Sequence, residues 1–166
     1  MDNNPAQTFW DKVAVRYAAR PVRDAAAYAD TLADVAARLR PSDRVLEIGC
    51  GTGTTATRLG GGVAEWTGAD FSPGMVRIAQ AKPAPAGVRF ILSDADTVFD
   101  GSPFDAVCAF HLLHLNIIQA EIAKLLVLRR FAQRCEFIGR DRIDEIQVSG
   151  LECCQNRIVV VRKHAL

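Results

Sequence analysis

Apolar residues are spaced in two different patterns along this chain, and the pattern changes near Arg44. Before it, apolar positions recur at helical spacing over residues 28–39, with Pro41 just past the end. Pro21 separates this predicted helix from an earlier one around residues 9–19. After Arg44, short apolar runs alternate with helical stretches. The pattern therefore predicts two helices followed by a region of alternating strands and helices.

Four apolar runs predict strands, at residues 44–48, 65–69, 88–92 and 104–110. A helix is expected at residues 54–59, and another opens at Ser72-Pro73, because serine caps a helix and proline suits its first position. Strands that alternate with helices are typical of parallel strands joined by right-handed crossovers. Near-continuous apolar strands indicate a sheet covered on both faces. We therefore expect an α/β fold with a doubly wound, mostly parallel, Rossmann-like sheet and helices on both faces.

Composition narrows the class of protein. The length of 166 residues suggests one domain, and a hydrophobic content of 49% is that of a globular chain. A net charge of +1 gives no case for nucleic acid, and no run of Lys or Arg indicates a membrane surface. Five cysteines, an odd number without C-x-x-C spacing, favour a reducing cytoplasm over a disulfide framework or zinc site. No apolar stretch is long enough to span a membrane.

The candidate chemistry gathers where the predicted strands end. Glu47 lies at the end of the first strand and the glycines of VLEIGCGTG (45–53) follow it, while Asp70 follows the second strand and Asp94 the third. Ligands of doubly wound sheets bind beyond these carboxyl ends, and glycines let the backbone approach them closely. The three carboxylates favour a nucleoside that carries a positive charge. A nicotinamide dinucleotide fits less well, because Thr54 stands where G-x-G-x-x-G needs its third glycine.

Four motifs in order resemble the class I S-adenosylmethionine (SAM)-dependent methyltransferases. They are VLEIGCGTG (45–53), GADFSPGMV (68–76), SDAD (93–96) and FDAVCAFHLLHL (104–115). The resemblance implies SAM as cofactor, with Asp70 at the ribose and Asp94 near the adenine. It also implies that FWDKVAVRYAA, at residues 9–19, belongs to a helical lid over residues 1–42, with residues 43–166 as the core of a single domain. The expected reaction is in-line transfer of a methyl group to a small-molecule nucleophile.

The cofactor-binding residues that this resemblance implies come from the lid and from all four motifs. They are Tyr17, Glu47, Gly49, Cys50, Gly51, Gly53, Asp70, Phe71, Met75, Asp94, Ala95, Phe110 and His111. No catalytic residue is assigned beyond His111 as a weak candidate, because a thiolate or neutral amine can attack the methyl group unaided. His111 and His114 lack an obvious third ligand, so we expect no metal.

The resemblance weakens after Asn116. Residues 117–134 predict one helix, CEFIG (135–139) is a very short candidate for a fifth strand, and LECCQ with RIVVVRK predicts a closing antiparallel hairpin. Loss of the fifth strand would leave the fourth with an unpaired edge, which is the argument for a possible homodimer. It also supports an alternative function, a protein that binds SAM or S-adenosylhomocysteine (SAH) without catalysis.

Overall fold

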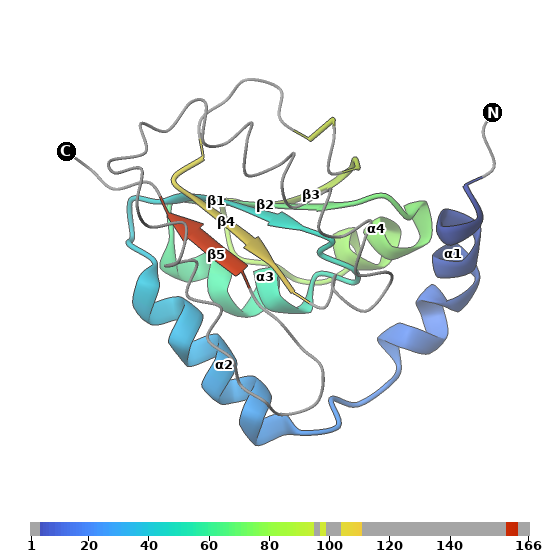
Figure 1. The fold of residues 1–166 in the computed structure, drawn as a ribbon, viewed down its shortest axis with the longest axis horizontal. Helices are drawn as coiled ribbons and strands as arrows, with labels where there is room; N and C mark the ends of the chain where they lie inside the picture. Colours follow the sequence, from blue (N-terminus) through green and yellow to red (C-terminus); the bar gives the residue numbers. More distant parts are fainter. Residues whose placement is uncertain (1–3, 95–96, 99–103, 111–158, 163–166) are drawn as a thin grey trace, which may run out of the picture.

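The computed structural model describes residues 4–94, 97–98, 104–110 and 159–162 (Figure 1). Two helices come first, α1 (Pro5–Ala18) and α2 (Ala25–Arg38). The Asn4 side chain accepts from the Ala6 N–H at the start of α1, and Asp24 accepts from the Ala27 N–H at the start of α2. Each helix therefore begins where a capping side chain satisfies a free backbone donor.

The alternating region follows the predicted boundaries closely. The strands are β1 (Arg44–Ile48), β2 (Glu65–Asp70), β3 (Val88–Leu92) and β4 (Ala106–Ala109), so only β4 is clearly shorter than predicted. Helix α3 (Thr54–Leu59) follows β1, and the 3-10 turn η1 (Gly60–Gly62) leads toward β2. Helix α4 (Pro73–Gln80) begins as predicted, with the Ser72 hydroxyl accepting from the Met75 N–H.

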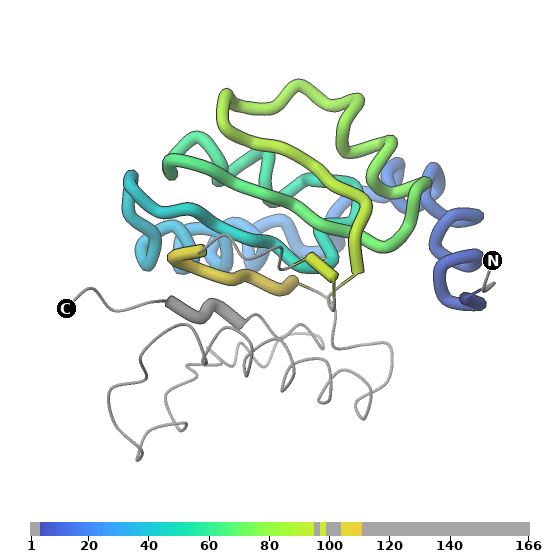
Figure 2. The backbone as a smooth tube through the Cα atoms, turned by 90° about the horizontal axis from the view of Figure 1, so that it is seen from above, coloured from blue at the N-terminus to red at the C-terminus, as the bar shows by residue number. Residues whose placement is uncertain are grey.

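The sheet has the strand order β3-β2-β1-β4-β5, which Figure 2 shows from above. Strands β1 to β4 are parallel, and the chain crosses from β3 to the far side of β1 to form β4. Such a reversal of strand order opens a crevice beyond the carboxyl ends of the two central strands. The Rossmann-like parallel sheet is therefore confirmed, and the switch point lies between β1 and β4.

The edge of β4 is paired, so the unpaired edge that loss of a fifth strand would leave does not occur. Strand β5 (Val159–Arg162) runs antiparallel to β4, with Val107 opposite Val161. This strand lies within RIVVVRK of the predicted hairpin, while LECCQ, CEFIG and residues 117–134 lie outside the described residues. Because a strand from the end of the chain covers β4, the edge argument for a homodimer falls away.

Alternate residues of the strands divide the core between the two faces of the sheet. On one face Val45, Trp66, Phe90 and Cys108 pack with residues of α2, α3 and α4. On the other face Leu46, Ile48, Ala69 and Val107 pack with Val98 and Phe104. The described helices cover the first face, and the helices predicted for the second lie outside the described residues. The packing explains why the strands read as continuous apolar runs.

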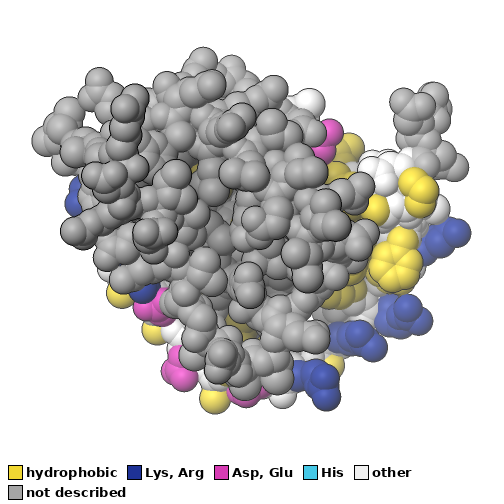
Figure 3. Space-filling model, in the orientation of Figure 1, with side chains coloured by type: hydrophobic (Ala, Val, Ile, Leu, Met, Phe, Trp, Pro, Cys, Tyr) yellow, Lys and Arg dark blue, Asp and Glu magenta, His cyan; other side chains and the backbone are white. Residues whose placement is uncertain are grey.

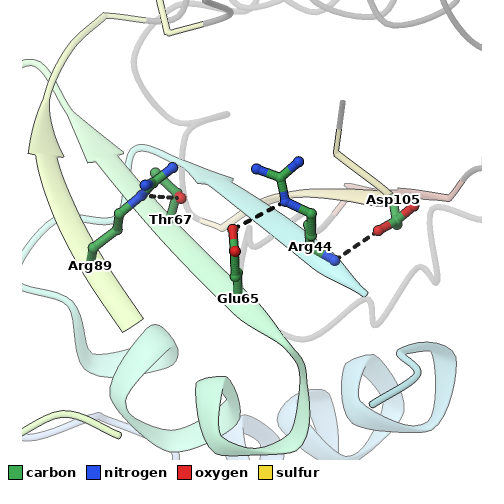
Figure 4. A network of polar contacts seen from close by, with 5 residues as sticks. All are labelled: Arg44, Glu65, Thr67, Arg89 and Asp105. Atoms are coloured by element: carbon green, nitrogen blue, oxygen red, sulfur yellow. Dashed lines mark hydrogen bonds and ion pairs between the residues drawn. The ribbon is translucent and has the colours of Figure 1, made fainter. Parts of the chain in front are cut away.

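Polar side chains hold the amino ends of the strands in register (Figure 4). The Arg44 Nε donates to Glu65 Oε2 over 3.1 Å, which joins β1 to β2. The Arg89 Nε donates to Thr67 Oγ1 over 2.9 Å, which joins β3 to β2. The Arg44 N–H donates to Asp105 Oδ2 beside β4. These contacts lie at the amino ends of the strands. The candidate ligand site lies at the opposite, carboxyl ends.

Candidate cofactor site

The turn after β1 contains three glycines in left-handed backbone conformation. Their φ angles are 67° at Gly49, 53° at Gly51 and 75° at Gly53. A side chain disfavours this conformation, so the turn explains why glycine stands at all three positions. The structure gives Gly51 and Gly53 different surroundings, although the sequence predicted one role for both.

Gly51 faces open space, whereas Gly53 faces the core. A Cβ built on Gly51 meets nothing within 4 Å. A Cβ built on Gly53 lies 2.6 Å from Phe90 Cζ and 2.9 Å from Ala79 Cβ. Gly53 therefore lets α3 and α4 pack closely against the sheet, and Gly51 leaves room for a ligand against the backbone of the turn.

Asp70, the last residue of β2, binds the glycine turn directly. Its Oδ2 accepts from the Gly51 N–H at 2.8 Å, and its Oδ1 accepts from the Ser72 N–H at 2.9 Å. Burial raises the pKa of Asp70, while these two hydrogen bonds act to lower it. The carboxylate thus fixes the turn after β1 relative to the start of α4, and it lies at the edge of the sheet where the sequence placed it.

Glu47 lies beneath the turn and is 1% exposed. The Trp66 Nε1 donates to Glu47 Oε2 over 3.0 Å, and no other hydrogen bond or ion pair of this carboxyl occurs in the described part of the chain. Burial is the main reason that the pKa of Glu47 rises to about 8, and the nearby Asp70 raises it further. The structure therefore holds a buried acid, with one oxygen free of such partners, near Cys50 of the turn and near Asp70.

The other predicted cofactor residues divide into exposed and buried ones. Asp94 is exposed, and its Oδ1 accepts from both the Thr97 N–H and the Thr97 hydroxyl. Phe71 is half-buried, while the buried residues are Cys50, Met75 and Phe110. Cys50 and Phe110 belong to the core on the side of α2 and α3. Ala95 and the catalytic candidate His111 lie outside the described residues.

Helix α1 is anchored to the start of α4 by residues that the sequence analysis missed. Asp11 Oδ1 accepts from the Ser72 hydroxyl at 2.5 Å and from the Gly74 N–H at 2.8 Å. The Gln7 Nε2 donates to the Phe71 carbonyl over 2.7 Å. These partners lie more than sixty residues away in sequence, so no local pattern signalled them. They hold α1 next to the loop that follows Asp70.

Tyr17 is the residue of α1 that the sequence placed at the site. It is 42% exposed, and its ring stacks edge-to-face with Trp10 at a centroid distance of 5.9 Å. Partial burial raises the pKa of Tyr17, with smaller contributions from the phenol of Tyr28 and the charge of Asp70. Tyr17 is therefore close enough to Asp70 for the carboxylate charge to raise the pKa of its phenol.

Lys82 adds a cation near the turn that the sequence analysis also missed. Its Nζ donates to Thr54 Oγ1 over 3.1 Å and to Thr52 Oγ1 over 3.3 Å. Burial lowers the pKa of Lys82. These hydrogen bonds connect the segment after α4 to the glycine turn at Thr52 and to the start of α3 at Thr54.

Comparison with known proteins decides the family. A family model described as a methyltransferase domain matches residues 45–136, which include the glycine turn, Asp70 and Asp94. The chain belongs to the methyltransferase domain family. Within this methyltransferase domain, the turn, the strand-end acids and the switch point all lie in the matched segment.

Relatives and solved structures agree with this assignment. A demethylmenaquinone methyltransferase of Mycolicibacterium vanbaalenii is 42% identical over 67 residues, which are 39% of this chain and 29% of that protein. The magnesium protoporphyrin IX methyltransferase of Synechocystis, solved with bound SAM, has a TM-score of 0.57 at 18% identity, covering 78% of this chain and 73% of that chain. The DhpI–SAH complex has a TM-score of 0.55 at 27% identity, covering 76% and 61%. The chain spans less than half the length of the curated relatives it matches.

Two further properties concern only the part of this methyltransferase domain that the structure describes. There, no three side chains of His, Cys, Asp or Glu lie together as a metal site would require. No helix in the same residues is both long and apolar enough to cross a membrane.

Proposed function

We propose that this chain binds SAM at the carboxyl ends of β1 and β2 and transfers its methyl group to a small-molecule acceptor. The observation that carries the proposal is the open space over Gly51, next to the carboxylate of Asp70. The family match and the SAM and SAH named with the two solved structures support the same cofactor.

The described residues fit the shape and charge of this cofactor. Gly51 leaves its backbone accessible, and Asp70 presents a carboxylate at the distance along the chain where a ribose diol is usually bound. Asp70 places a carboxylate beside a ligand that carries positive charge on sulfur and nitrogen, which favours its binding. Exposed Asp94 stands at the end of β3, where the adenine is expected.

Orientation is the main contribution that the protein makes to such a reaction. Bound SAM supplies a methyl group on a positively charged sulfur, which a nucleophile displaces directly. Hydrogen bonds to Asp70 and from Lys82 hold the turn in place, and good orientation of the reactants alone can lower a barrier by roughly 7–11 kcal/mol. We infer that residues 1–42 form the lid, because Gln7 and Asp11 dock α1 beside the site.

A transfer assay with labelled SAM tests the proposal. The first acceptors to test are quinols and phenols, because one relative is named a demethylmenaquinone methyltransferase. We expect the label to reach an organic acceptor, and the D70N variant to lose most of that transfer. Binding of SAH without transfer to any acceptor would favour the alternative of a non-catalytic binding protein. Failure to bind either SAM or SAH would contradict the proposal.

A further inference from the structure

Large exposed apolar side chains gather on α1 and the segment after it. Of the five found in the described part of the chain, three besides Tyr17 of the candidate cofactor site lie between residues 9 and 22, and the fifth is Leu92. Phe9 is 54% exposed, Val15 76% and Val22 46%. Scattered exposed apolar residues are ordinary, but a group of them on one helix marks a surface that meets a partner.

Basic side chains surround these apolar residues. The exposed cations of the same segment are Lys12, Arg16, Arg20 and Arg23, and residues 12–23 contain no acid. None of the four makes an ion pair or side-chain hydrogen bond within the described part of the chain. The flanking acids are engaged elsewhere, Asp11 with the start of α4 and Asp24 with the start of α2.

Helix geometry places these two kinds of residue on one side of α1. Phe9, Lys12 and Arg16 are spaced by three and four positions and so share a face. Ala14, on the opposite side, is buried, and Asp11 contacts α4. Figure 3 shows apolar side chains beside Lys and Arg over α1, with the acidic side chains of this view mostly over α2. We use the name α1 face for the exposed helix residues Phe9, Lys12, Val15 and Arg16 together with the exposed residues Arg20, Val22 and Arg23 of the segment directly after the helix.

We propose that the α1 face docks on the surface of an anionic lipid bilayer. Cations attract the negative headgroups, and apolar side chains between them enter the headgroup boundary, as in other surface-bound amphipathic helices. A nucleic acid would use the cations but gives little to Val15 and Val22 on the same surface. The sequence analysis found no sign of a membrane partner because the chain has no run of Lys or Arg, and the four cations here are separated by two to three other residues each.

Co-sedimentation with lipid vesicles tests the proposal and needs no methyl acceptor, so its result is independent of the proposed reaction. The probes are vesicles of phosphatidylglycerol mixed with phosphatidylcholine, vesicles of phosphatidylcholine alone, and a short DNA duplex. The K12Q/R16Q variant removes two charges from the α1 face. The control R40Q/R77Q removes two charges from exposed residues outside the α1 face. The F9S variant tests the apolar part, and thermal melting confirms that each variant folds.

We expect binding to the anionic vesicles that weakens with added salt and is much weaker on phosphatidylcholine alone. K12Q/R16Q should reduce the partition coefficient about 25-fold, because each basic residue near an anionic surface contributes roughly a fivefold change. R40Q/R77Q should reduce it by about threefold or less, through general charge alone. F9S should also weaken binding. The proposal is overturned if folded wild-type protein does not bind the anionic vesicles, if both double variants bind alike, or if the duplex binds more tightly than the vesicles.

Discussion

The clearest test of the glycine turn compares Ala at Gly51 with Ala at Gly53. Both positions have left-handed backbone, which costs a side chain about 1–2 kcal/mol. At Gly51 nothing else opposes the new methyl group, so the loss of stability should remain about 1–2 kcal/mol. At Gly53 the methyl group would lie 2.6 Å from the Phe90 ring, and such overpacking adds about 1–3 kcal/mol. G53A should therefore lose about 2–5 kcal/mol in total.

Ligand affinity should change in the opposite order. The Cβ of G51A enters the space that we assign to the cofactor, so its affinity for SAH should fall at least about tenfold, or 1.4 kcal/mol. G53A, measured well below its melting temperature, should stay within about threefold of wild type. Urea unfolding gives the free energies of unfolding, and calorimetry gives the affinities. Equal destabilisation of the two variants, or weaker SAH binding by G53A than by G51A, would refute the different roles assigned to the two glycines.

Three further substitutions test the acids of the site. The D70N side chain has one acceptor oxygen for the two backbone donors that Asp70 binds, so this variant should lose about 1–3 kcal/mol of stability in urea unfolding. It should also bind SAH more weakly. Wild-type affinity for SAH would show that Asp70 does not contact the cofactor. Because the folded-state pKa of Glu47 is raised from 4.5 to about 8, its contribution to stability is complete below 4.5 and declines as pH rises toward 8. Stability measured across that window should therefore fall more in wild type than in E47Q, and parallel curves would contradict the raised pKa. D11A removes the oxygen that accepts hydrogen bonds from both Ser72 and Gly74. It should therefore speed the exchange of amide hydrogens in α1 and lower the free energy of unfolding by about 1–3 kcal/mol. Unchanged exchange would contradict the docking of α1 through Asp11.

Local patterns in the sequence were enough to predict the elements of the fold. Bounds of β1, α3 and β3 agree with the predicted ones, because apolar periodicity and flanking glycines act within a few residues. The capping of α4 by Ser72 was predictable for the same reason. The carboxyl-end acids were also found, since parallel strands bring their ends to one edge of a sheet.

Contacts between distant residues were beyond these patterns. Pairing of β4 with β5 joins segments about fifty residues apart, and nothing near either strand specifies its neighbour. The contact of Asp11 with Ser72 is of the same kind. Gly51 and Gly53 look alike in sequence, and only the position of the Phe90 ring separates a glycine that packs from one that leaves space.

The central claim is that the carboxyl ends of β1 and β2 form a SAM site. Its most direct test is a calorimetric titration of the purified protein with SAH, with NAD as the control ligand. We predict one site for SAH with a dissociation constant in the micromolar range, about −8 kcal/mol, and no binding of NAD. Binding of NAD in place of SAH, or binding of neither by folded protein, would contradict the account.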